Sequence, residues 1–283
     1  MREDILIASD STTDLSPELI EKYGIKIIPM GVNLGDKHFT DGVDIDPDAI
    51  YAHYEKTGEL PKTAAINIAD FEDFFRKNTK NYKNIIFFTI SSEMSSTFAN
   101  ARLAAESFEG VYAVDTRNLS TGGGLLLIRA AEMAESGMEA EDIVKACNEI
   151  APRVDASFII DDLEFLHKGG RCSALAAFGA NLLQLKPCIV VDNGKMSVGK
   201  KYRGKFAAVL DKYISERIGD GSNIEKDHVF VTHAGCDEEI VNECVRAAKE
   251  CMPDANVHIT RAGCTISSHC GRNTLGILFI KKN

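Results

Sequence analysis

Short β-type runs alternate with helical patterns through the first half of this 283-residue chain, and this alternation most constrains its fold. Three of these runs lie at residues 5–8, 84–90 and 111–114, and each leads into a polar, hydroxyl-rich loop before the next helical pattern. Strands that alternate with helices are typical of a parallel sheet, whose ligands bind beyond the carboxyl ends of the strands. We therefore expect three hydroxyl-rich loops to meet at one edge of a parallel sheet.

The pattern changes after Pro152. Strand-type runs at 156–160, 187–191, 196–198, 229–232 and 275–280 are interspersed with helical patterns at 206–218 and 238–251. Asn193-Gly194 lies between two of these runs and is the strongest short hairpin signal in the chain. These patterns predict a second α/β domain, with the division near residue 153, so that the domains span 1–153 and 154–283.

Composition argues against several classes of protein. Apolar residues make up 45% of the chain and charged residues 26%, values typical of globular proteins. The net charge of −10 argues against a nucleic-acid-binding surface. The eight cysteines all lie in the second half without a C-x-x-C pair, so we expect reduced thiols and no structural zinc site. No apolar run approaches the ~20 residues that span a bilayer, and we expect a cytoplasmic protein with no integral membrane segment or targeting segment.

The motifs that usually mark nucleotide and hydrolase sites are missing. The chain contains no G-x-x-x-x-G-K-[ST], no G-x-G-x-x-G, no H-E-x-x-H and no G-x-S-x-G. We therefore expect no cofactor and no metal.

The loop at residues 91–97 holds four serines and a threonine between a strand and a helix. Free backbone N–H groups and the helix dipole favour an anion at such a position, and the hydroxyls add neutral donors. Serine and threonine are also ordinary helix caps. Capping and carboxylate or phosphate binding are both open for this loop.

Other residues carry similar alternatives. Asp10 and Asp115 each follow a strand, and capping is favoured over metal binding because no further carboxylate has ligand spacing to either. Glycines 122–124 allow either ligand approach or close helix packing. Arg171 is either a fixed cation at a site or a surface ion-pair partner, and a lone histidine such as His269 is more often structural than catalytic.

Basic residues form two clusters in this acidic chain. A solvated surface is the ordinary interpretation, but two clusters beside one cleft would attract an anionic ligand or an acidic partner. The clusters comprise Lys168, Arg171, Lys200, Lys201, Arg203 and Lys205.

The order of these loops resembles the DegV family of bacterial fatty-acid-binding proteins. The resemblance covers nearly the whole chain and rests on the order and spacing of short motifs. They are residues 10–15 (DSTTDL), 62–63 (KT), 91–97 (SSEMSST), 115–122 (DTRNLSTG), 166–173 (LHKGGRCS), 185–187 (LKP), 203–204 (RG), 268–271 (SHCG) and 275–276 (LG). Two motifs depart from the family: Ala64-Ala65-Ile66 follows Thr63 in place of Ser-Gln-Pro, and Arg272-Asn273 replaces Pro-Gly.

The resemblance implies a two-domain α/β fold, with an N-terminal parallel-sheet, Rossmann-like domain and a C-terminal α/β domain that holds a lipid tail. One long-chain fatty acid would be buried with its carboxylate between the domains. A separate ATP-dependent fatty acid kinase subunit would phosphorylate that carboxylate to an acyl phosphate, as a step in phospholipid metabolism. The chain itself is expected to be a lipid-binding carrier and not an enzyme.

Carried over by position, the resemblance assigns the carboxylate to Thr63 and Ser92, with Ser95 and Ser96 as second choices. Arg171 and His269 would lie nearby. Lys168 and Arg203 would belong to the basic rim or partner surface.

A second hypothesis is a hydrolase or transferase that acts on an acyl or phosphoryl group. Ser92 or Ser95 would be its nucleophile and His269 its base. A third is a regulatory protein whose basic clusters bind an acidic partner.

Overall fold

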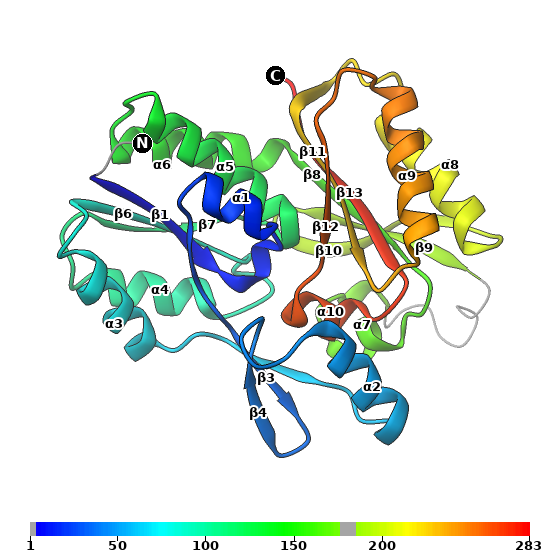
Figure 1. Ribbon diagram of the computed structural model, residues 1–283, viewed down its shortest axis with the longest axis horizontal. Helices are drawn as coiled ribbons and strands as arrows, with labels where there is room; N and C mark the ends of the chain where they lie inside the picture. Colours follow the sequence, from blue (N-terminus) through cyan, green and yellow to red (C-terminus); the bar gives the residue numbers. More distant parts are fainter. Residues whose placement is uncertain (1–3, 176–184) are drawn as a thin grey trace.

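The computed structural model describes residues 4–175 and 185–283 as two α/β units that lie side by side, with a small third unit at one edge of their junction (Figure 1). The first unit contains a four-stranded sheet, the second a six-stranded sheet, and the third a three-stranded sheet. The candidate functional site lies where the three units meet.

The first sheet is parallel throughout and has the order β2-β1-β6-β7. It confirms the three strands expected in the first half of the chain. Apolar residues fill both faces of the central strands, as expected for a parallel sheet covered on two sides. The strands are β1 (Ile5–Asp10), β2 (Lys26–Ile28), β6 (Asn84–Thr89) and β7 (Val111–Asp115).

Helices cover both faces of this sheet. Side chains alternate between the faces, so Ile85 and Phe87 pack with α3 and α4 while Ile86 and Phe88 pack with α1, α5 and α6. Ser16 accepts a hydrogen bond from the Leu19 N–H at the start of α1, the N-cap that the sequence predicts. The helices are α1 (Pro17–Lys22), α3 (Ile68–Asn78), α4 (Thr97–Ala105), α5 (Ser120–Glu135) and α6 (Ala140–Ile150).

The small unit is an antiparallel sheet of order β4-β3-β5, flanked by α2. The sequence patterns do not predict this unit. Its strands are only three or four residues long, so they carry no apolar run that a pattern search would find. The elements are β3 (Gly31–Leu34), β4 (Lys37–Thr40), α2 (Pro47–Thr57) and β5 (Lys62–Ala64). Short 3₁₀ turns lie at Ser11–Thr13 (η1) and Ala151–Arg153 (η2).

The second large sheet has the order β10-β9-β8-β13-β11-β12 and contains every strand expected after residue 153. All its pairs are antiparallel except β11 with β12. Its first strand starts at Val154, and we retain the division at residue 153 as a proposal. The strands are β8 (Val154–Ile160), β9 (Lys186–Asp192), β10 (Lys195–Tyr202), β11 (Ile224–Ala234), β12 (Val257–Arg261) and β13 (Thr274–Lys281).

The two faces of the six-stranded sheet have different neighbours. Helices α8 (Phe206–Ile218) and α9 (Glu238–Cys251) pack on one face. The other face packs against α5 near one end. Toward the other end it packs against α7 (Glu164–Gly169), α10 (Cys264–Cys270) and loops of the first unit. The two large units therefore meet on this second face of the six-stranded sheet.

The hairpin between β9 and β10 confirms the Asn193-Gly194 signal. Both residues have positive φ, 48° and 80°, as a two-residue type I′ turn requires. The tip of the hairpin reaches the first unit, where Ser91 Oγ donates to the Gly194 carbonyl at 2.8 Å and Arg117 donates to the Asn193 carbonyl. The hairpin thus holds the two large units together beside the hydroxyl-rich loops.

Glycines 122–124 serve close packing. All three lie buried in the first turns of α5, which packs against both large sheets. A Cβ atom on Gly124 would lie 2.7 Å from Leu15 Cδ2 and 3.1 Å from the Thr13 carbonyl oxygen, so a side chain there would displace the buried Leu15 side chain. This observation favours the packing alternative over ligand approach.

Candidate functional site

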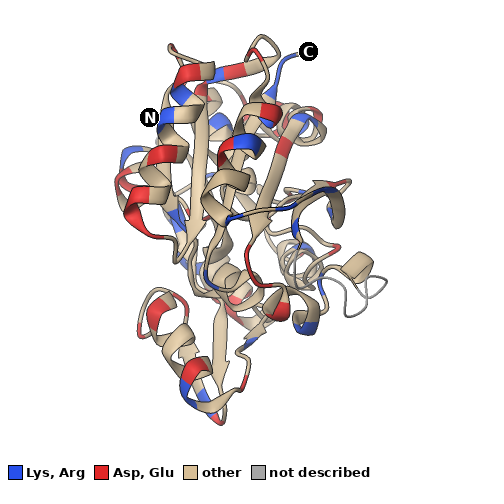
Figure 2. Ribbon diagram, turned by 90° about the vertical axis from the view of Figure 1, so that its right-hand side faces the viewer, with Lys and Arg blue, Asp and Glu red and all other residues tan. Residues whose placement is uncertain are grey.

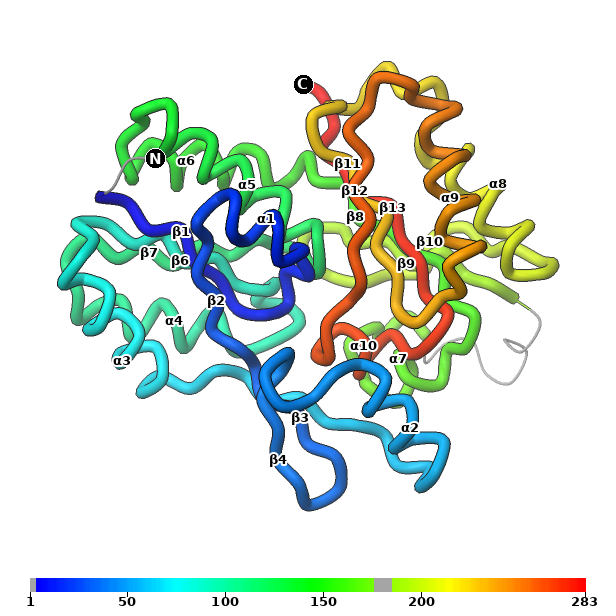
Figure 3. Tube along the Cα trace, viewed as in Figure 1, coloured from blue at the N-terminus to red at the C-terminus, as the bar shows by residue number. Residues whose placement is uncertain are grey.

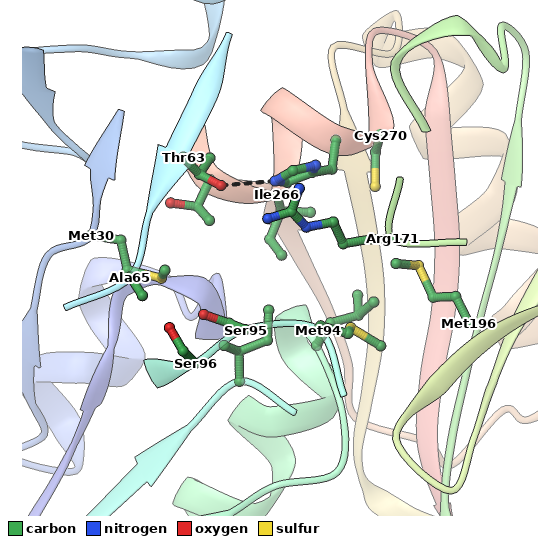
Figure 4. A pocket seen from close by; sticks show the side chains of 14 residues that line it. Met30, Thr63, Ala65, Met94, Ser95, Ser96, Arg171, Met196, Ile266 and Cys270 are labelled. Atoms are coloured by element: carbon green, nitrogen blue, oxygen red, sulfur yellow. Dashed lines mark hydrogen bonds between the residues drawn. The ribbon is translucent and has the colours of Figure 1, made fainter. Parts of the chain in front are cut away.

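A cavity of about 270 Å³ lies at the junction of the three units (Figure 4). Its walls come from β5, the loop before α4, the strand end at Ile90, β10, α10 and Arg171. The lining residues are Met30, Thr63, Ala65, Ile90, Met94, Ser95, Ser96, Leu119, Arg171, Met196, Thr265, Ile266, His269 and Cys270. Five of the six predicted ligand-binding residues, all except Ser92, are therefore brought together.

Thr63 and His269 form one polar part of the cavity. The Thr63 hydroxyl lies 2.9 Å from His269 Nε2, in the hydrogen bond drawn in Figure 4. Burial, aided by the charge of Arg171, lowers the pKa of His269 to about 4, so the ring is neutral near pH 7. Its Nδ1 atom is buried and has no hydrogen-bond partner among the described residues. A neutral imidazole with a spare ring nitrogen is thus available at this site.

Arg171 contributes a positive charge. Its guanidinium donates to the Gly169 carbonyl at 2.8 Å, and it makes no ion pair within the described residues. Among the described residues, the lining contains no aspartate or glutamate. The cavity therefore favours an anion over a cation.

Ser95 and Ser96 lie where the 91–97 loop enters α4, and they use their hydroxyls differently. Ser95 Oγ accepts from the Thr97 N–H at 3.2 Å and is 2.9 Å from Thr97 Oγ1, so this serine caps the helix. Ser96 occupies the N-cap position without a side-chain capping bond. Its hydroxyl is therefore free to bind an anion beside the positive end of the α4 dipole.

Ser92 does not line the cavity. It is exposed, its hydroxyl accepts from Arg117 at 3.2 Å, and its N–H donates to Asp115 Oδ1 at 3.2 Å. The loop makes a helix-like turn, in which the Met94 and Ser95 N–H groups both bond to the Ser91 carbonyl. Ser95 lines the cavity, whereas the Ser92 hydroxyl contacts Arg117 outside it.

Asp10 caps the 3₁₀ turn η1, the role that the sequence favours, whereas Asp115 binds loop N–H groups and caps no described helix. Asp10 accepts from the Thr12 N–H at 3.0 Å and from the Ile90 N–H at 2.8 Å, which ties two strand ends together. Asp115 accepts from the N–H groups of Ser92 and Arg117. Within residues 4–175 and 185–283, no group of His, Cys, Asp and Glu side chains is arranged to hold a metal ion.

The remaining cations do not surround the cavity. Lys168 pairs with Glu164 at 2.5 Å and Lys200 pairs with Glu216 at 2.7 Å. Arg203 follows the end of β10 seven residues beyond Met196, roughly 20 Å along an extended chain. Figure 2 shows basic and acidic residues interspersed over the surface. Arg171 is thus the one member of the two basic clusters that lines the cavity.

The apolar wall was not found from the sequence. Leu119, Ile266 and Cys270 also line a second, smaller void of about 30 Å³. Burial raises the pKa of the Cys270 thiol to about 12, so it behaves as an apolar wall group. The cavity walls join a buried cluster around Phe158, and this cluster lies on the six-stranded sheet. A ligand with a polar head and an apolar tail matches these surroundings.

Short helix α10 supplies much of the wall and lies between the three units (Figure 3). Its first N–H groups are held by aspartates from the other units: Asp41 accepts from Cys264 and Thr265, and Asp14 accepts from Gly263 at 2.8 Å. Burial raises the pKa of Asp14 to about 8. Sequence reasoning missed both anchoring roles, because nothing local links these aspartates to residues more than 200 positions away.

The serine–histidine pair of the hydrolase hypothesis does not form. His269 Nε2 bonds to Thr63, Ser95 Oγ bonds to Thr97, and Ser92 lies outside the cavity. Within the described part of the chain, no serine hydroxyl is hydrogen-bonded to His269. The geometry therefore suits binding better than nucleophilic catalysis.

Comparisons with known proteins agree in family and fold. A family model described as "Uncharacterised protein, DegV family" matches residues 4–282. A DegV domain-containing protein of Clostridium perfringens is 30% identical over 283 residues, which cover 98% of this chain and 99% of the relative. A similar protein of Caldanaerobacter subterraneus is 29% identical, with 99% of this chain and 100% of the relative covered.

Solved structures are similar over the full length. A DegV family protein from Thermus thermophilus, described as fatty acid binding, has a TM-score of 0.89 at 26% identity, with 100% of both chains covered. DegV of Bacillus subtilis, described as a fatty acid binding protein, has a TM-score of 0.86 at 27% identity, with 99% of this chain and 100% of that chain covered. Within the part of this chain that is described, no helix is both long and apolar enough to cross a bilayer.

Proposed function

This chain belongs to the DegV family, and from that premise and the geometry of the cavity we propose that it binds one long-chain fatty acid. The observation that carries the proposal is a cavity whose described lining has hydroxyls, a neutral imidazole, one arginine and no acidic residue, and whose wall continues into an apolar cluster. Two structural neighbours described as fatty acid binding support the same ligand class.

The carboxylate would be bound by Thr63, Ser95, Ser96, Arg171 and His269. An ionised carboxylate removed from water is costly unless it is paired and hydrogen-bonded. Hydroxyls, the start of α4 and the Arg171 guanidinium supply neutral donors and one charge, and a charge-assisted bond is roughly twice as strong as a neutral one. We prefer Ser95 and Ser96 to Ser92 because only the former two line the cavity.

The acyl chain would lie along the apolar wall toward the second sheet. A chain of about fourteen methylenes gains roughly 11 kcal/mol on burial at about 0.8 kcal/mol per methylene. The open volume of about 270 Å³ is just below the usual range of roughly 300–1,000 Å³ for ligand sites. The tail would therefore also occupy space that side chains of the buried cluster fill when no lipid is bound.

In this proposal the protein is a cytoplasmic carrier that presents the carboxylate to a separate ATP-dependent kinase subunit, which forms an acyl phosphate for phospholipid metabolism. Arg171 is exposed, so the head-group end is within reach of a partner. Its positive charge would also stabilise the additional negative charge of an acyl phosphate. Lys168 and Arg203, both exposed, would belong to the partner surface.

Lipid extraction and binding assays test the proposal. We expect an organic extract of the purified protein to contain a fatty acid by mass spectrometry, and we expect the delipidated protein to bind added octadecanoic acid. Ser96→Ala and Arg171→Gln should each weaken binding roughly 10- to 150-fold, since a hydrogen bond to a charged group contributes about 1.5–3 kcal/mol. Ser92→Ala is the matched control and should leave affinity unchanged. Failure of wild-type protein to bind fatty acid would refute the function, and equal loss in Ser92→Ala would refute the assignment of Ser96.

A kinase assay tests the carrier role separately. Adding an ATP-dependent fatty acid kinase subunit and ATP to the loaded protein should yield acyl phosphate, whereas the loaded protein with ATP alone should yield none. Product formed without the kinase subunit would contradict the carrier role.

A further inference from the structure

Three of the seven methionines of the chain line this one cavity. Met30 follows β2, Met94 lies in the loop before α4, and Met196 lies in β10, so the three come from separate segments. All are buried, with at most 8% of their surface exposed. This gathering of thioethers around a cavity is a property of the tertiary structure that no local pattern encodes.

Met94 and Met196 lie between the open cavity and the apolar cluster behind it. Figure 4 shows both on the side of the cavity away from Thr63. Both also belong to the buried cluster that contains Phe158 and Ile189 of the second sheet. An acyl chain whose carboxylate lies near Thr63 and whose tail extends along this side of the cavity contacts both side chains.

Methionine is suited to this position because it is unbranched, has three rotatable side-chain bonds and carries a polarisable sulfur. It can change shape at small cost, whereas isoleucine and valine are restricted at χ1. The open volume of about 270 Å³ requires some lining side chains to move when a long tail binds. Met94 and Met196 are the flexible side chains at the place where that movement is needed.

We propose that Met94 and Met196 determine which acyl chains bind, and that they allow the site to accept straight saturated and bent cis-unsaturated chains of equal length with similar affinity. This inference rests on the proposed function and extends it to the shape of the ligand. The thioether side chains adopt different rotamers around the two tail shapes. A wall of β-branched side chains at the same positions would fit one shape and exclude the other.

Competition binding with delipidated protein and a fluorescent fatty acid tests this inference. The competitors are octadecanoic acid and cis-9-octadecenoic acid. We expect wild-type protein to bind them with affinities within about threefold of each other. Met94→Ile and Met196→Ile should each weaken binding of the bent chain about tenfold more than that of the straight chain, a difference of about 1.4 kcal/mol. Met94→Leu and Met196→Leu avoid β-branching, so each should keep most of the wild-type affinity for both lipids.

Met133→Ile is the matched control, because Met133 packs on the core around α5 and does not line the cavity. It should leave the affinity ratio of the two lipids unchanged. A wild-type ratio above tenfold, or an unchanged ratio in both folded isoleucine variants, would overturn the inference. If the isoleucine variants unfold, the wild-type ratio and the leucine variants still decide it. Binding of neither lipid by wild-type protein would instead refute the proposed function.

Discussion

Asp41 joins the small unit to the second large unit, and replacing it tests how the cavity is held together. The side chain is 5% exposed, and its two oxygens accept four hydrogen bonds. Oδ1 accepts from the Cys264 N–H at 2.8 Å. Oδ2 accepts from the Thr265 N–H at 3.0 Å, the Thr265 hydroxyl at 2.7 Å and the Ser11 hydroxyl at 2.9 Å. The perturbation is Asp41→Asn, which keeps the shape and removes one acceptor.

The size of the effect follows from which donors can adapt. The asparagine NH₂ group donates and cannot accept. The hydroxyls of Ser11 and Thr265 can rotate to accept from it, but a backbone N–H cannot. Whichever way the amide turns, one buried N–H loses its acceptor, at about 1–3 kcal/mol. Asp41→Ala leaves both N–H groups unsatisfied, and we expect a loss of about 2–6 kcal/mol.

Urea unfolding followed by circular dichroism measures these losses, with Asp44→Asn as the control. Asp44 lies nearby on the exposed surface, where its carboxylate accepts from the Thr40 N–H at 2.6 Å. We expect the control to change the free energy of unfolding by less than about 0.5 kcal/mol. If Asp41→Asn costs no more than Asp44→Asn, the anchoring role assigned to Asp41 is refuted.

Two further predictions concern the histidines. Thr63→Val leaves His269 Nε2 without its hydroxyl partner and should weaken fatty acid binding about tenfold. Thr63→Ser keeps a hydroxyl and should bind with nearly wild-type affinity. Equal affinities of Thr63→Val and wild-type protein in the competition assay would contradict this role. Burial, with the nearby His228 and Lys22 charges, lowers the pKa of His258 from 6.5 to about 4. The unfolded chain therefore takes up the proton first, and the free energy of unfolding should fall as the pH drops from about 6.5 to about 4. His258→Gln should make this fall shallower in urea titrations, and unchanged slopes would contradict the assignment.

Local patterns predict the large sheets well because their signals are local. The run at 84–90 reads as a strand through its apolar, β-branched and aromatic residues, and Asn193-Gly194 specifies its turn through φ preference alone. The parallel sheet in turn brings the loops at residues 10–15, 91–97 and 115–122 to one edge. The short strands of the small unit carry no comparable signal, and its antiparallel pairing is visible only in the structure.

The candidate site is predictable only in part, since its chemistry depends on loop geometry and distant contacts. The spacing of the 91–97 loop does not distinguish Ser92 from Ser95, because contacts distant in the sequence decide which hydroxyl meets the cavity: Ser92 binds Arg117, and Ser95 lines the cavity. Met94 lies within a serine-rich loop, and its sequence position does not show that it lines a cavity. Arg203 and Arg171 have similar sequence surroundings, but only Arg171 is placed at the cavity.

In the proposed function, the location of the site would couple fatty acid binding to the association of the three units. Thr63, Ser96 and Ile266 come from different units, so a fatty acid that contacts all three binds the assembled arrangement and not the separated one. A ligand that binds only the folded state at about 100 times its Kd stabilises that state by about 2.7 kcal/mol. This gain is comparable to the loss expected for Asp41→Asn. Saturating fatty acid should therefore restore most of the stability of that variant. Asp41 does not line the cavity, so Asp41→Asn should change the affinity for fatty acid only through the position of α10.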